Sequence, residues 1–83
     1  MVEIKVLGPG CANCKRLEQI THKVVDMLGA DAVIEKVTDY AQIVDLGVMA
    51  TPGLIVNNEV VSSGRIPSEA EITQWVEQAL SLQ

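Results

Sequence analysis

The sequence predicts an α/β fold with a four-stranded mixed sheet flanked by three helices, in the order βαβαββα. Short segments rich in Val and Ile alternate along the chain with segments whose apolar residues recur every three or four positions. Glycine and proline separate the two kinds of segment. A strand, a helix and a second strand at the start of the chain imply a parallel pair joined by a crossover, and a closing hairpin adds antiparallel strands.

The first predicted strand is Val2–Leu7, which ends at the turn sequence Gly8-Pro9-Gly10. An amphipathic helix follows from Ala12 to Leu28, and Gly29 provides its C-terminal stop. The apolar stripe of this helix consists of Leu17, Ile20, Val24, Met27 and Leu28.

A second strand is predicted at Ala32–Val37, and Thr38 or Asp39 can cap a short helix after it. This helix ends before Gly47 and carries Tyr40, Ile43, Val44 and Leu46.

The last part of the sequence predicts a hairpin and a helix. Segments 54–56 and 60–62 flank Asn57-Asn58-Glu59, and Asn tolerates the positive φ that a tight hairpin turn requires. Ser68 and Glu71 have the spacing of a capping box, which predicts the start of a C-terminal helix. Helical spacing continues through Ile72, Trp75, Val76, Ala79 and Leu80.

Length and composition limit the function classes. The chain has 83 residues, so we expect one domain over residues 1–83. Its formal net charge of -5 argues against nucleic acid or an anionic membrane as the main partner, because both bind basic surfaces. No apolar run approaches the roughly 18 residues of a membrane span, and no signal peptide precedes the first strand. We therefore expect a cytoplasmic protein.

Both cysteines of the chain lie in the stretch Cys11-Ala12-Asn13-Cys14, at the start of the first predicted helix. One local pair differs from the disulfide framework of a secreted domain and indicates redox or metal chemistry. The helix N-terminus favours a thiolate at Cys11 over the free thiol, whose ordinary pKa is about 8.5. Cys14 lies three residues before Leu17 and belongs to the apolar stripe, so it should be more buried. Cys11 is thus the candidate nucleophile, and Cys14 the candidate that resolves the mixed disulfide.

Three other features of the sequence are expected to have structural positions and no catalytic role. We expect Gly8-Pro9-Gly10 to keep bulky side chains away from Cys11. His22, the only histidine, lies eleven residues after Cys11, about 16 Å along the helix, and is expected on the surface. Trp75 lies on the apolar stripe of the last helix and is expected in the core.

A second signal precedes the hairpin, in Met49-Ala50-Thr51-Pro52-Gly53. Proline removes a backbone donor, so it fits the start of a strand better than the middle. A cis Thr51-Pro52 bond would leave the backbone of Thr51 unpaired and facing the Cys11 loop.

Together, these elements and motifs resemble the thioredoxin superfamily, specifically its small thioredoxin-like and glutaredoxin-like redox-active disulfide proteins. The resemblance covers essentially the whole chain and implies a thioredoxin-like fold. It implies that Cys11 is the nucleophile and Cys14 the resolving thiol. It also implies that Pro52 is a cis-proline and that the backbone of Thr51 pairs with substrate. Gly64 would match the family's small residue that lines the substrate groove.

By this resemblance, the chain is a thiol-disulfide oxidoreductase that cycles between a Cys11–Cys14 disulfide and a dithiol, without a bound cofactor or metal. The implied partners are protein disulfides and an upstream thiol reductant such as a thioredoxin reductase, and the expected state is a monomer. Two departures stand out. Ala12-Asn13 replaces the Gly-Pro of typical thioredoxins and the Pro-Tyr of glutaredoxins. The reduction potentials of those proteins therefore cannot be assigned to this chain. Lys5 stands about where typical thioredoxins place a buried acid.

Two other classes of protein remain open. A soft-metal carrier could hold Cu(I) or share Zn with two thiolates, although domains of that class run βαββαβ and usually have Met where this chain has Pro9. A structural zinc site needs four ligands, so zinc would require a dimer here. An interaction domain with idle thiols is the third class, and retained partner binding after both cysteines are changed to Ser would favour it.

Overall fold

A computed structural model describes residues 1–81 of the chain. It contains seven elements in the predicted order βαβαββα. They are β1 (Val2–Leu7), α1 (Ala12–Leu28), β2 (Ala32–Val37), α2 (Tyr40–Asp45), β3 (Gly53–Val56), β4 (Glu59–Ser63) and α3 (Glu69–Ser81).

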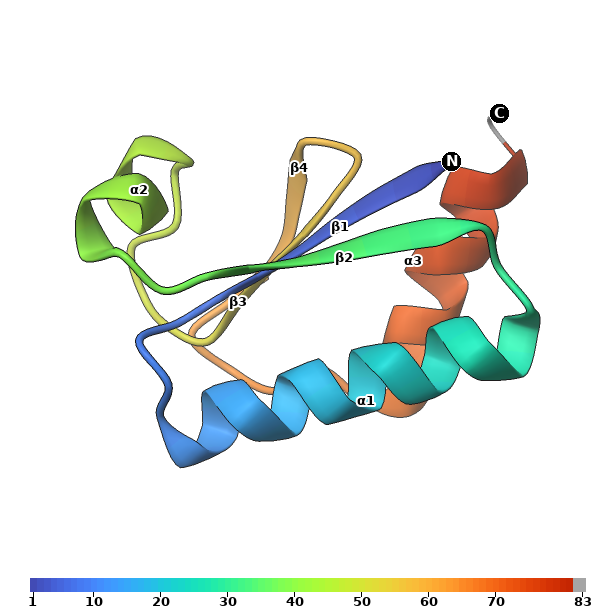
Figure 1. Cartoon of the computed structure of the whole chain (residues 1–83), viewed down its shortest axis with the longest axis horizontal. Coiled ribbons are helices and arrows are strands. Elements are labelled where there is room, and N and C mark those ends of the chain that lie inside the picture. The colour runs from blue at the N-terminus through green and yellow to red at the C-terminus, as the bar shows by residue number, and fades with distance from the viewer. Residues whose placement is uncertain (82–83) are drawn as a thin grey trace.

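The four strands form one mixed sheet in the spatial order β2-β1-β3-β4 (Figure 1). Strand β1 pairs in parallel with β2 and antiparallel with β3, which pairs antiparallel with β4. The crossover through α1 connects the parallel pair, as the sequence predicts. The confirmed fold is therefore an α/β thioredoxin-like arrangement of a four-stranded mixed sheet and three helices.

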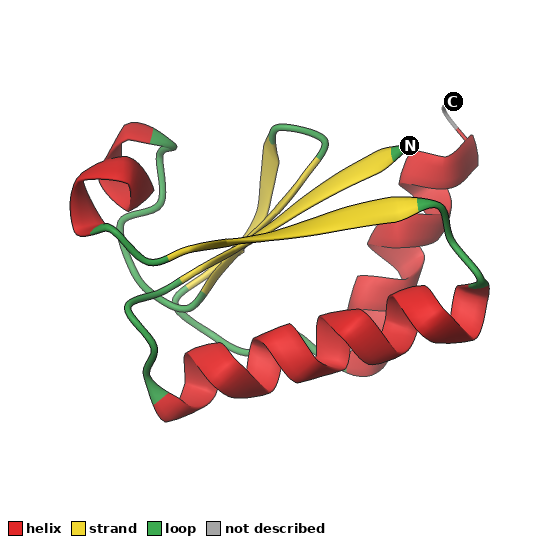
Figure 2. Cartoon of the chain, viewed as in Figure 1, coloured by secondary structure: helices red, strands yellow, loops and turns green. Residues whose placement is uncertain are grey.

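The two faces of the sheet are covered unequally. Helices α1 and α3 lie on one face, whereas α2 lies at one end of the other (Figure 2). The alternation of side chains along β1 sends Val2, Ile4 and Val6 toward α1 and α3, and Leu7 toward α2. The larger core consists of Val2, Ile4, Val6, Leu17, Val24, Leu54, Val56, Ile72, Val76 and Ala79. The smaller core consists of Leu7, Val37, Ile43, Val48 and Ile55.

Local signals set the ends of the helices. Gly29 ends α1 in the left-handed region, at φ 59°, where its N–H donates to the carbonyl of Asp26. Asp39 caps α2 by accepting the N–H of Ala41 at 2.9 Å. The predicted capping box of α3 is present: Ser68 Oγ accepts the N–H of Glu71, and Glu71 Oε1 accepts the N–H of Ser68, both at 3.1 Å.

The structure departs from the sequence predictions in several details. The hairpin turn has two residues, Asn57 and Asn58, both at positive φ, and Glu59 begins β4. Trp75 is only partly buried against the larger core. Four residues of the predicted apolar spacing are exposed, because each helix has only one face against the sheet. These exposed residues are Met27, Tyr40, Val44 and Leu46.

Of the helices described, none has the length and apolar character that a bilayer crossing requires.

Candidate active site

Cys11 and Cys14 form a disulfide with their Cα atoms 5.0 Å apart. They lie where the chain leaves the C-terminal end of β1 and enters α1. The N–H of Gly8 donates to the carbonyl of Val37 at 2.9 Å, which extends the β1–β2 pairing into this loop. The sheet therefore fixes the start of the loop, and α1 fixes its end.

The two sulfur atoms have different surroundings. Cys11 is exposed and occupies the N-cap position of α1, where its Sγ accepts the N–H of Cys14 at 3.1 Å. Cys14 lies in the first turn and retains only 4% of its accessible surface. The sequence-based expectation of one accessible and one buried cysteine is thus seen in the structure. Sequence reasoning placed Cys11 at the helix start but did not identify its sulfur as the capping atom.

Gly8 makes the close packing of Cys14 possible. A Cβ atom on Gly8 would collide with Cys14 Sγ and would lie 2.9 Å from Cys14 Cβ. Gly8 therefore makes room for the buried Cys14, whereas we expected it to clear space around the exposed Cys11. The same position borders Thr51, whose Cβ would lie 3.9 Å away. Only its place directly after a buried strand and six residues before Cys14 could have indicated this role.

The Thr51-Pro52 segment lies beside the disulfide loop. The Thr51-Pro52 peptide bond is cis. Pro52 is buried, and its carbonyl accepts the N–H of Gly64 at 3.0 Å. Gly64 has φ 80°, and a Cβ there would lie 3.1 Å from the Cβ of Ala50. The structure thus places Thr51 next to Gly8 of the disulfide loop, and it joins Gly64 to Pro52, the residue that follows Thr51.

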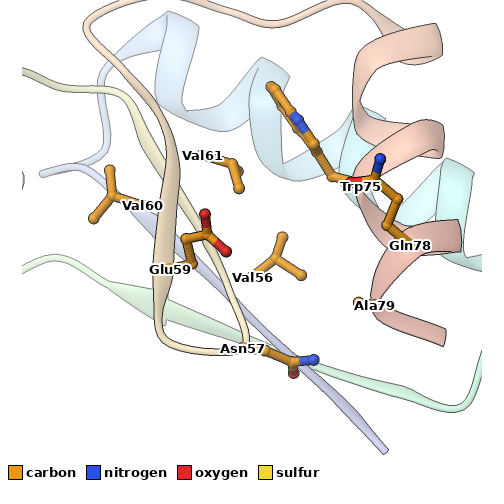
Figure 3. Close-up of a pocket in the computed structure, with 8 residues that line it drawn as sticks. All are labelled: Val56, Asn57, Glu59, Val60, Val61, Trp75, Gln78 and Ala79. Carbon is orange, nitrogen blue, oxygen red and sulfur yellow. The ribbon is translucent and has the colours of Figure 1, made fainter. Parts of the chain in front are cut away.

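Three residues considered from the sequence lie away from the sulfurs. Lys5 shares the α2 face of the sheet with Leu7, whereas α1 packs on the opposite face. His22 is exposed on α1, and its Nε2 lies 4.0 Å from Glu18 Oε1. Trp75 lines a groove of about 340 Å³ between the hairpin and α3 (Figure 3).

One ion pair stabilises the chain between Gly64 and α3. The guanidinium of Arg65 donates two hydrogen bonds to the carboxylate of Glu71, at 3.2 and 2.8 Å. These bonds, together with the N–H of Ser68, lower the pKa of Glu71 from its ordinary value of 4.5 to about 2. The same pairing raises the pKa of Arg65. Glu71 therefore connects the N-terminal cap of α3 to Arg65, the residue after Gly64.

The cysteines have no third candidate metal ligand in residues 1–81, since no group of three or more His, Cys, Asp or Glu side chains gathers there. A zinc ion at the cysteines would have to find its other ligands outside these residues. The donor set supplied by this part of the chain is two sulfurs.

A disulfide at a helix N-terminus, with one exposed and one buried sulfur beside a cis-proline, defines the class of small thiol-disulfide redox proteins. Comparison with known proteins identifies a family within this class. Residues 2–77 match the family model described as a thioredoxin domain.

Two curated relatives are similar over most of their length. A thioredoxin of Methanothermobacter thermautotrophicus is 43% identical over 72 residues, which cover 87% of this chain and 94% of the relative. A thioredoxin of Methanocaldococcus jannaschii is 40% identical over 74 residues, which cover 89% of this chain and 85% of the relative. The chain belongs to the thioredoxin family. It is a thiol-disulfide oxidoreductase, as the sequence predicts.

Proposed function

We propose that Cys11 is the attacking nucleophile of this oxidoreductase and that Cys14 is the resolving thiol. The observation that carries the proposal is the inequality of the two sulfurs. Cys11 is exposed at the N-cap of α1, where its sulfur accepts a backbone N–H, and Cys14 is buried one turn further on. An acceptor position at the positive end of a helix stabilises a thiolate, and only an exposed thiolate can reach a disulfide in another protein.

The proposed reaction begins with the dithiol form. The Cys11 thiolate attacks one sulfur of a substrate disulfide, a mixed disulfide forms, and the second substrate sulfur leaves as a thiolate that takes up a proton. The Cys14 sulfur, after losing its proton, then attacks Cys11 Sγ. The Cys11–Cys14 disulfide forms, the first substrate sulfur leaves, and two electrons have passed from this chain to the substrate.

Thr51, Pro52 and Gly64 form the proposed substrate-docking edge beside Cys11. Two observations support this role for Thr51. Its position borders that of Gly8 in the disulfide loop, and its backbone takes part in none of the hydrogen bonds found between described residues. An extended substrate segment could therefore pair with this backbone while its disulfide lies over Cys11. Pro52 and Gly64 would hold the edge in place through their 3.0 Å hydrogen bond.

The partners proposed for the complete cycle are protein disulfides as substrates and an upstream thiol reductant, such as a thioredoxin reductase, that restores the dithiol. We propose that the protein acts as a monomer in the cytoplasm. The cysteine content supports that compartment, because the chain has a single local pair and no further cysteine.

Trapping of mixed disulfides tests the assignment. In Cys14→Ser, the mixed disulfide on Cys11 cannot be resolved, so it should accumulate with a model protein disulfide and appear as a mass increase that a reductant removes. Cys11→Ser is the matched control and should trap little, because its remaining thiol is buried. Equal trapping by both variants, or none by either, would contradict the assigned roles.

A further inference from the structure

We propose that the preferred substrates of this protein are disulfides flanked by acidic side chains, an inference that rests on the function proposed above. The formal net charge of -5 suggests the opposite preference, for basic substrates. The distribution of charge around the disulfide decides between the two.

Three of the six lysine and arginine side chains are held by carboxylates on neighbouring elements. Their nitrogen to oxygen distances are 3.2, 3.3 and 2.8 Å, so their positive charge is largely compensated locally. These ion pairs are Lys23–Glu69, Lys36–Glu18 and Arg65–Glu71.

The lysine and arginine side chains without a carboxylate within 4.0 Å, considering residues 1–81, are Lys5, Lys15 and Arg16. Lys5 is half-buried on the α2 face of the sheet. Lys15 and Arg16 are exposed on α1, four and five residues after Cys11. At the rise of an α-helix they lie about 6 and 7.5 Å along the axis from Cys11. The uncompensated positive charge of α1 is therefore next to the accessible sulfur.

Four of the eight Asp and Glu side chains without an ion pair in residues 1–81 lie toward the end of the molecule that is far from Cys11. Asp26 is fifteen residues along α1 from Cys11, about 22 Å. Asp31 and Glu3 lie where β1 begins, since Val2 bonds to the backbone of Asp31 and Glu3 to Asn57 of the hairpin turn. Glu59 starts β4 at the same hairpin. Further carboxylates without an ion pair among the described residues are Glu35, Asp39, Asp45 and Glu77.

Asp39 and Asp45 flank α2, which lies at the same end of the sheet as the start of α1 but on the opposite face (Figure 1). They form the acidic side of this end, and Lys15 and Arg16 form the basic side. Glu77 lies in α3 between Trp75 and Ala79, which face the hairpin.

Screening by salt determines which charges of the protein act on a docking substrate. The Debye length is about 10 Å at 0.1 M salt, so carboxylates about 20 Å from Cys11 are largely screened, whereas Lys15 and Arg16 are within range. An acidic residue beside a substrate disulfide can then approach the first turns of α1 and bring the disulfide to Cys11. The local charge outweighs the net charge of the chain.

Two peptide disulfides of the same sequence, flanked by Asp in one and by Lys in the other, test this preference. The reduced protein is mixed with each in single turnover, and the rate is read as release of peptide thiols. At about 0.1 M salt, the low-salt condition of this test, the Debye length is about 10 Å and carboxylates about 20 Å away are largely screened. We expect the Asp peptide to react about tenfold faster under this condition, and the ratio should approach one at about 1 M. The double variant Lys15→Gln/Arg16→Gln should bring the low-salt ratio close to one. Lys23→Gln, which removes one positive charge about 18 Å from Cys11 on the same helix, should preserve it.

The ratio of the two rates is the informative quantity. A change in the thiolate fraction of Cys11 would alter both rates by the same factor and leave the ratio unchanged. A faster Lys peptide, equal rates at low salt, or a ratio that survives in the double variant would overturn the acidic preference. If wild-type protein reduces neither peptide above the uncatalysed rate, the function proposed for Cys11 and Cys14 fails instead.

Discussion

Gly8 has no side chain, and the space beside its Cα is filled by the buried sulfur of Cys14. In this family member, the buried Cys14 is accommodated by the absence of a single methyl group at Gly8. The effect is steric, because Gly8 directly follows a regular strand and does not have the positive φ that would strain a residue with a side chain. A substitution there should act through packing alone.

Gly8→Ala should lower the free energy of unfolding by about 1–3 kcal/mol, the usual cost of one extra carbon in a packed site. The measurement is urea unfolding of the reduced protein, so that the disulfide does not differ between samples. In a Cys14→Ala background, where the colliding sulfur is gone, the cost should shrink. An equal cost in both backgrounds would show that Cys14 is not the cause.

Ser62 is a second residue whose environment predicts a measurable effect. Its hydroxyl is buried in β4 and finds no hydrogen-bond partner among the described residues. Burial of an unsatisfied hydroxyl costs about 1–3 kcal/mol, so Ser62→Ala should leave stability unchanged or raise it. The neighbouring Ser63→Ala, which removes a bond to the carbonyl of Ala50, is the control for loss of a serine hydroxyl. A clear decrease in the unfolding midpoint of Ser62→Ala would refute the prediction.

At the scale of elements, the start of α3 depends on one carboxylate that has two roles. Glu71 accepts the N–H of Ser68 in the capping box and pairs with Arg65, and these bonds depress its pKa to about 2. In the window between about 2 and 4.5, the folded state binds fewer protons at Glu71 than the unfolded state does. The contribution of Glu71 to stability is therefore complete above pH 4.5 and is lost as the pH falls toward 2.

Glu71→Gln should flatten this part of the stability profile. Chemical unfolding at several pH values between 2 and 5 would measure it, with Glu69→Gln as a control on the same helical turn. The wild type should lose stability more steeply than Glu71→Gln as the pH falls. Parallel profiles for the two proteins would argue that the bonds of Glu71 do not persist in solution.

The elements also show what the sequence can predict. Periodicity and turn residues were sufficient for all seven elements, because each has a local stop or cap such as Gly29, Asp39 or Ser68. The exposure of Tyr40 and Val44 was not predictable, since α2 has only six residues and buries Ile43 alone. Whether an apolar residue finds a partner depends on neighbours that are distant in sequence.

In the candidate site too, features that depend on local sequence were predictable, and contacts between distant segments were not. The order of Cys11 and Cys14 on a helix predicted one exposed and one buried sulfur, because that depends on helical spacing alone. The contact of Gly8 with Cys14, and of Gly64 with Ala50, required the positions of separate elements and appeared only in the structure. The same holds for Trp75, which faces a groove formed by the hairpin.

At the scale of the whole molecule, the fluorescent side chain and the disulfide are at different places. Trp75 lines a groove with Val56 and Asn57, which lie beside Ile4 and Glu3 of β1. The disulfide lies beyond Leu7, the last residue of β1. A disulfide quenches tryptophan emission only at close range, so reduction should leave the emission of Trp75 unchanged, and unfolding should change it. Emission spectra of the oxidised and reduced folded protein check this. A change in intensity on reduction alone would show that the two regions are coupled.

The central claim is that Cys11 and Cys14 form a reversible two-electron couple. The most direct test equilibrates the protein with a series of glutathione redox buffers in the presence of a chelator, alkylates the free thiols, and reads the fraction of disulfide by mass. We expect one transition between roughly -300 and -120 mV, with a tenfold change in the ratio of disulfide to dithiol for about every 30 mV. If no intramolecular disulfide forms in any buffer, the pair is not a redox couple, and soft-metal binding becomes the function to test.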